Sequence, residues 1–173
     1  MASIGRILNY NPPAERRIPS QVLATWENGI FLKKEDINRD IKGLRSPQIG
    51  AIYATLSHWE VSSDAATIVM PTGTGKTEVM LSLLIAASCY KTMIIVPTDA
   101  LRSQISNKVA SLGLLADPQF SIVKETVLKP IVGVMSHRPA SSEEAIAFME
   151  QCNVVVTTIS ITVSYTHLTL PTT

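Results

Sequence analysis

The sequence has few of the features that mark specialised classes of protein. Its 173 residues include only two cysteines, which excludes a disulfide scaffold. The two cysteines and three histidines are not spaced in any pattern typical of metal ligands. The apolar run over residues 79–90 is too short to span a bilayer, and the first 17 residues lack the apolar centre of a signal peptide. The net charge of +1 points to neither a nucleic-acid nor a membrane partner. We therefore expect a cytoplasmic protein with no membrane segment.

What the chain does have is enough apolar sequence for one compact core. Apolar residues make up 46% of it, and the 17% of charged residues is too sparse for a disordered chain. Apolar runs over 66–70, 92–96, 131–135 and 153–158 predict strands, and the run over 92–96 predicts a strand buried on both faces. Helical patterns lie between them. This alternation predicts an α/β fold, with a parallel sheet and helices on both faces.

Several residues predict where helices begin and what they bury. Ser46 is expected to cap a helix, with Pro47 in its first turn, and Thr98 to cap a helix after the strand over 92–96. A further helix is expected over residues 76–90. Both tryptophans, Trp26 and Trp59, are expected in the core.

A glycine-rich segment with one lysine lies between a predicted strand and a predicted helix. Gly73 and Gly75 allow positive φ and a close approach of a ligand to the backbone. The next amides and the positive end of the helix then form an anion site for the β- and γ-phosphates of a nucleotide. Lys76 supplies a charge to those phosphates, and the hydroxyl of Thr77 is placed to hold Mg²⁺. The segment reads Pro71-Thr72-Gly73-Thr74-Gly75-Lys76-Thr77, and the strict pattern has glycine where this chain has Met70.

This loop and three further segments resemble the superfamily 2 helicases and translocases, most closely the DEAD/DEAH and type III restriction-subunit-like branch. The loop is similar to the variant in which the first glycine is not required. The other segments follow the family's order: Leu44-Arg45-Ser46-Pro47-Gln48 resembles the glutamine motif, Val96-Pro97-Thr98-Asp99-Ala100-Leu101-Arg102-Ser103-Gln104 the motif after the second strand, and Val155-Val156-Thr157-Thr158 the Thr-Thr motif. The resemblance covers about residues 43–160 and implies a RecA-like P-loop NTPase lobe.

The resemblance also implies what the site residues do. Gln48 would read adenine, because its amide offers a donor and an acceptor to the N6/N7 edge. Lys76 and Thr77 would be the catalytic residues of this segment, with Thr77 holding Mg²⁺. The implied ATP-binding residues are Arg45, Gln48, Thr72, Gly73, Thr74, Gly75, Lys76 and Thr77. The implied nucleic-acid contacts, to backbone phosphates, are Pro97, Thr98, Arg102, Gln104, Thr157 and Thr158, with DNA favoured over RNA.

One element that such enzymes need for hydrolysis is missing, because the sequence contains no Asp-Glu pair. In the family that pair holds Mg²⁺ through water and activates the attacking water. We expect a first lobe truncated before this motif, without the second RecA-like lobe, that binds ATP but does not hydrolyse it. The full-length parent is expected to be an ATP-dependent helicase or translocase. Two alternatives remain open: a P-loop ATPase that does not act on nucleic acid, and an inactive nucleotide-binding fragment.

The chain divides, on these grounds, into three parts. Residues 1–42 are expected to be an irregular lead-in with one short helix, and residues 43–160 the partial ATP-binding lobe. No Asp, Glu, Lys or Arg follows Glu150, and Thr and Ser alternate with apolar residues near the end of the chain. Residues 161–173 are therefore expected to be a foreign or disordered tail.

Overall fold

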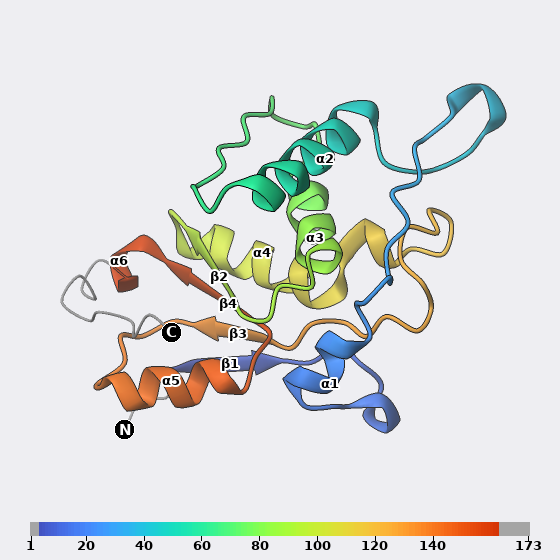
Figure 1. The fold of residues 1–173 in the computed structure, drawn as a ribbon. Helices are drawn as coiled ribbons and strands as arrows, with labels where there is room; N and C mark the ends of the chain where they lie inside the picture. The colour runs from blue at the N-terminus through green and yellow to red at the C-terminus, as the bar shows by residue number, and fades with distance from the viewer. Residues whose placement is uncertain (1–3, 163–173) are drawn as a thin grey trace. The chain divides into compact units, whose positions relative to one another are not determined.

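The computed structural model describes residues 4–162, which cluster into two compact units. Unit 1 contains residues 4–23, 90–111 and 129–162, and unit 2 contains residues 24–89 and 112–128. Figure 1 shows the helices (α), 3₁₀ helices (η) and strands (β) in chain order. They are β1 (Gly5–Leu8), η1 (Pro13–Glu15), α1 (Pro19–Ala24), η2 (Ile37–Arg39), α2 (Ser46–Val61), α3 (Lys76–Ala86), β2 (Thr92–Val96), α4 (Asp99–Ser111), η3 (Gly113–Ala116), β3 (Val132–Met135), α5 (Ser142–Glu150), β4 (Val154–Thr158) and α6 (Ile159–Thr162).

Unit 1 is built on a four-stranded sheet with the strand order β1-β3-β4-β2. Strands β2 and β3 both run parallel to β4, and β1 pairs with β3 in antiparallel orientation. The connections β2–α4–β3 and β3–α5–β4 cross the sheet in opposite directions. Because such crossovers are right-handed, α4 and α5 cover opposite faces of the sheet (Figure 1). The predicted α/β fold with helices on both faces is confirmed.

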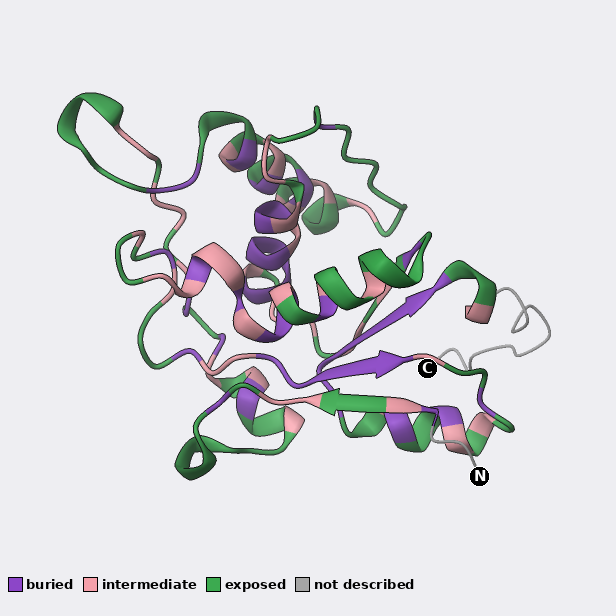
Figure 2. Cartoon of the chain, turned by 180° about the vertical axis from the view of Figure 1, so that it is seen from behind, coloured by how far each residue is buried: buried purple, intermediate pink, exposed green. Residues whose placement is uncertain are grey.

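The strands at the centre of this sheet carry its core. Strands β3 and β4 are buried along their whole length, whereas β1 is exposed at its two middle residues (Figure 2). On one face, Gly133 lets α5 approach closely, since a Cβ there would lie 2.6 Å from the sulfur of Cys152 and 2.8 Å from the ring of Phe148. The buried cluster on this face consists of Ile4, Met135, Phe148, Cys152 and Val155.

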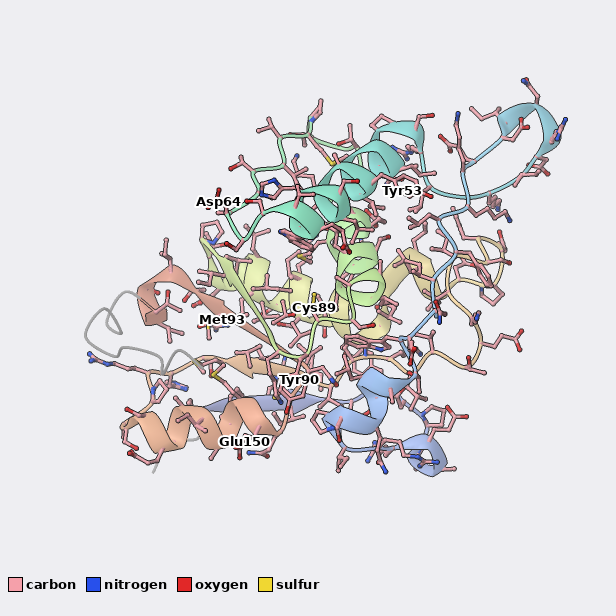
Figure 3. The ribbon with its side chains drawn as sticks, viewed as in Figure 1. Tyr53, Asp64, Cys89, Tyr90, Met93 and Glu150 are labelled. Carbon is pink, nitrogen blue, oxygen red and sulfur yellow. The ribbon has the colours of Figure 1, made fainter. Side chains whose placement is uncertain are left out.

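A lysine closes the end of α5. The ammonium group of Lys91 donates hydrogen bonds to the carbonyls of Met149 (3.0 Å), Glu150 (3.2 Å) and Cys152 (2.6 Å). Figure 3 marks Glu150 at the end of this helix and Tyr90, the residue that precedes Lys91 in the sequence. These carbonyls lie in the last turn of α5 and just after it, so a cation there adds a hydrogen bond to each and suits the negative end of the helix dipole. Desolvation lowers the pKa of Lys91.

Unit 2 packs α2 against α3. The apolar body of α3 is buried, with Leu81 and Ile85 fully inaccessible to solvent. Trp26 is also buried, as expected, and its indole nitrogen donates to the carbonyl of Leu128 at 3.0 Å, so its one polar group is satisfied.

One strand prediction is wrong, and another is wrong in part. Residues 66–70 form no strand, and Ile68 and Val69 are 41% and 89% exposed. A β-prone run becomes a strand only where a neighbour pairs with its backbone, and among the described residues none pairs with this run. Strand β2 forms, but only one face is covered: it lies at the sheet edge, and Met93 (Figure 3) and Ile95 are 41% and 50% exposed.

The helix boundaries and the N-terminal lead-in also need correction. Arg45, not Ser46, takes the N-cap position of α2, with Ser46 already helical. Helix α3 ends at Ala86 because Ser88 adopts a left-handed conformation. Trp59 is 45% exposed because, although it continues the stripe of the buried Ile52 and Thr55, it lies in the last turn of α2. The segment expected to be an irregular lead-in contains the four-residue edge strand β1. The prolines that follow it favoured irregular structure in the sequence-based prediction.

The remaining strands and caps are confirmed. Strands β3 and β4 lie within one residue of their predicted bounds, and the hydroxyl of Thr98 accepts from the amide of Leu101 at 3.3 Å at the start of α4. Most of the expected tail, from residue 163 on, lies outside the described residues. Between residues 4 and 162, no helix has both the length and the apolar character that crossing a bilayer requires.

Candidate functional site

The glycine-rich loop of unit 2 ends at the first turn of α3. Gly73 and Gly75 adopt φ of +80° and +85°, conformations that favour glycine, and Gly75 is the N-cap of the helix. The first amides of α3 have no partner within the helix, and the positive end of its dipole lies there. This is the local structure expected of an anion-binding loop.

The functional side chains of the loop hydrogen-bond to the loop itself. The ammonium group of Lys76 donates to the carbonyl of Pro71 at 3.0 Å, and the hydroxyl of Thr74 donates to the same carbonyl at 2.6 Å. Thr72 and Lys76 are exposed, and Thr77 is half-buried in the first turn of α3. The loop therefore presents an accessible cation next to free helix amides.

The start of α2 contacts the same loop. The guanidinium of Arg45 donates to the carbonyl of Gly73 at 3.1 Å, and the side-chain amide of Gln48 donates to the carbonyl of Gly75 at 3.2 Å. The side-chain oxygen of Gln48 accepts from the backbone amide of Arg45 at 2.7 Å, which fixes the orientation of the side chain. Gln48 is 4% exposed. Arg45 and Gln48, far from the loop in sequence, are thus joined to it.

Gly75 is needed here for space as well as for conformation. A Cβ on it would lie 2.0 Å from the amide nitrogen of Gln48 and 3.0 Å from a carboxylate oxygen of Glu78. Glu78 is 8% exposed in the first turn of α3, and the sequence analysis did not single it out. An acid in the first turn of a helix is ordinary, so the sequence gives no signal that this carboxylate borders the loop.

The residues predicted to contact nucleic acid belong to unit 1. Val96 and Thr158 are paired in register in parallel strands, so Pro97 and Thr98 leave the sheet at the same edge as Thr158. Ligands of open α/β sheets bind at this carboxyl edge. Pro97, Thr98 and Gln104 are exposed.

The other three predicted contacts in this unit are held within the protein. Thr157 and Thr158 are 0% and 2% exposed, and the hydroxyl of Thr157 has no hydrogen-bond partner among residues 4–162. The guanidinium of Arg102 pairs with Asp99 at 2.9 Å, and its side chain is 12% exposed. The structure thus places Pro97, Thr98 and Thr158 at one sheet edge and leaves three of the six residues open to solvent, and the role of all six stays a prediction.

Metal and thiol chemistry have little support elsewhere in the chain. Over residues 4–162, the structure has no group of three or more His, Cys, Asp and Glu side chains that could hold a metal ion. Burial raises the pKa of the Cys152 thiol to about 12, so it remains protonated at neutral pH. The hydroxyl of Thr77 and the oxygens of a phosphate are the kind of hard donor that Mg²⁺ prefers.

The chain was compared with protein families, curated proteins and solved structures. The family model described as type III restriction enzyme, res subunit, matches residues 41–166 of the chain. This range includes the Arg45–Gln48 segment, the loop and the residues at the carboxyl edge of the sheet. No curated protein and no solved structure matched.

Proposed function

The chain belongs to the family of type III restriction enzyme res subunits, a superfamily 2 helicase domain, and we propose that it is the ATP-binding first lobe of a DNA helicase or translocase. The family as a whole consists of ATP-dependent, helicase-like enzymes of nucleic acids. The choice of DNA over RNA rests on the restriction enzymes for which the family is named.

The observation that carries the proposal is the pair of hydrogen bonds from α2 to the loop. Arg45 and Gln48 bond to the carbonyls of Gly73 and Gly75, so the residues proposed to recognise adenine lie beside those proposed to hold phosphate. Their placement supports one ligand with both a base and a phosphate tail.

Each residue of the loop has a distinct part in binding ATP. The ammonium group of Lys76 leaves the carbonyl of Pro71 and pairs with the β- and γ-phosphates, while the first amides of α3 donate to phosphate oxygens. Thr77 is the residue that would hold Mg²⁺, which supplies charge neutralisation for the phosphates. Because the sequence has no Asp-Glu pair, we expect ATP to bind without being hydrolysed by this chain alone.

Nucleic acid would bind at the carboxyl edge of the sheet in unit 1. The exposed Thr98 at the start of α4 and the exposed Gln104 are suited to phosphate oxygens rather than to bases. Binding of this kind is insensitive to sequence and weakens as salt is added.

Base selectivity tests the proposal. In Gln48→Ala, the preference for ATP over GTP should disappear, with ATP binding weakened about threefold to tenfold because one amide no longer reads the base. The matched control, Gln104→Ala, removes an exposed glutamine of unit 1 and should leave the preference intact. The measurement is titration calorimetry with each nucleotide. An unchanged ATP preference in Gln48→Ala would favour a P-loop protein that recognises phosphate alone.

A further inference from the structure

One carbonyl of the phosphate loop has two side-chain donors. Pro71 accepts from the hydroxyl of Thr74 at 2.6 Å and from the ammonium group of Lys76 at 3.0 Å. The carbonyls of Gly73 and Gly75 accept from Arg45 and Gln48. Of these three carbonyls, that of Pro71 is the one whose donor is also the proposed phosphate ligand.

This arrangement matters when a nucleotide binds. Lys76 must then exchange the carbonyl of Pro71 for phosphate oxygens, and the phosphates cover the loop and displace water from it. A carbonyl left without a donor in a covered site costs free energy comparable to a lost hydrogen bond. The hydroxyl of Thr74 is already bonded to this carbonyl, so the carbonyl keeps a partner after Lys76 has left.

The shared acceptor also affects the nucleotide-free protein. Two donors on one carbonyl oxygen compete for its electron density, so the hydroxyl of Thr74 weakens the contact that holds Lys76 away from the phosphate position. Removing the hydroxyl would strengthen that contact before binding and leave the carbonyl without a donor after it. Both effects oppose ATP binding.

We propose that Thr74 is a positioning residue: its hydroxyl remains the hydrogen-bond donor to the carbonyl of Pro71, so that Lys76 can leave this carbonyl and bind the phosphates. The inference rests on the proposed function, because it assumes that the loop binds a nucleotide. It assigns to Thr74 a task that the phosphate-binding pattern of the loop does not require, since the pattern fixes the glycines, the lysine and the following threonine.

The test compares two substitutions of Thr74 in the full chain. Thr74→Val keeps the branched shape and volume without the hydroxyl, and Thr74→Ser keeps the hydroxyl. We expect ATP with Mg²⁺ to bind Thr74→Val about threefold to tenfold more weakly and Thr74→Ser as in the wild type, measured by titration calorimetry. The binding of GTP to Thr74→Val should weaken by the same factor, because Thr74 acts at the phosphate end of the nucleotide and not at the base.

A second pair of variants tests whether Thr74 acts through the lysine. In a Lys76→Met background, Thr74→Val should lower ATP affinity by a smaller factor than it does with Lys76 present, because no lysine remains to be released and only the unpartnered carbonyl of Pro71 remains; an equal or larger factor there would overturn the proposal, as would wild-type affinity in Thr74→Val itself. A change in the ATP-to-GTP ratio would show that the substitution distorts the loop, and it would also overturn the assignment. If the wild type binds no nucleotide, the proposed function fails as well, whereas normal binding by Thr74→Val refutes this inference alone.

Discussion

The predicted nucleotide-binding residues of unit 2 bond to one another, whereas the predicted nucleic-acid residues of unit 1 are related only by strand register. In unit 2, Arg45, Gln48 and Lys76 all donate to carbonyls of a single five-residue stretch. In unit 1, Thr157 and Thr158 are buried and Arg102 is paired with Asp99. A ligand can therefore reach Arg45 and Lys76 by displacing exposed hydrogen bonds, while the buried Gln48 and some side chains of the second set have to be released first.

The largest expected effect separates these two sets. Lys76→Ala should weaken ATP binding about tenfold to a hundredfold, because it removes the charged partner of the phosphates, and should leave DNA binding unchanged. Arg102→Ala should leave ATP binding unchanged and lower the salt dependence of DNA binding by about one unit of slope, as the loss of one phosphate contact predicts. Calorimetry with ATP and fluorescence anisotropy with a labelled oligonucleotide measure the two affinities. If each substitution weakened the binding of both ATP and DNA, the assignment of separate sites would be wrong.

The next effect tests the close packing of unit 2 at Gly75. Gly75→Ala places a Cβ 2.0 Å from the amide nitrogen of Gln48 and also strains a φ of +85°, so Gln48 has to move. Gly73→Ala is a matched control, because its φ is +80° but its Cβ would meet no atom within 4 Å. Both variants should lose about 1 kcal/mol of stability from backbone strain, and Gly75→Ala about 1–2 kcal/mol more. Urea denaturation measures the difference, and equal losses would contradict the packing.

The sequence predicts those parts of the fold and of the site whose patterns are local, and it fails where a feature depends on distant segments. The loop, Gln48 and strands β3 and β4 are recognisable because their patterns are local: glycine spacing, an amide at a helix start and short β-branched runs. The run over residues 66–70 has the same local pattern but no strand beside it, and pairing with a distant segment cannot be seen in a single short stretch.

The contacts of the site were less predictable than its members. Hydrogen bonds from Arg45 and Gln48 to particular loop carbonyls depend on how α2 packs against α3, which composition and spacing do not specify. Glu78 beside Gly75 was missed because an acid in the first turn of a helix is ordinary. The burial of Thr157 was also unforeseen, since threonine is common on both faces of strands.

The smallest expected effect concerns the frame of unit 1. Lys91→Met keeps most of the apolar stem of the side chain but removes the donor to three carbonyls at the end of α5, and should lower the free energy of unfolding by about 1–2 kcal/mol. Lys91→Arg retains a cation with several donors and should cost less. Because Lys91 lies in unit 1, ATP affinity should be unaffected in both variants. Urea denaturation and calorimetry check these two expectations, and a loss of ATP affinity in Lys91→Met would show that unit 1 supports the nucleotide site.

The most direct test of the account is to follow backbone and side-chain amide resonances by NMR while ATP and Mg²⁺ are added to the chain. We expect the largest shifts at the amides of Gly73, Gly75, Lys76 and Thr77 and at the side-chain amide of Gln48, because these groups surround the proposed nucleotide. Saturable shifts confined to other residues, with these five unchanged, would contradict it.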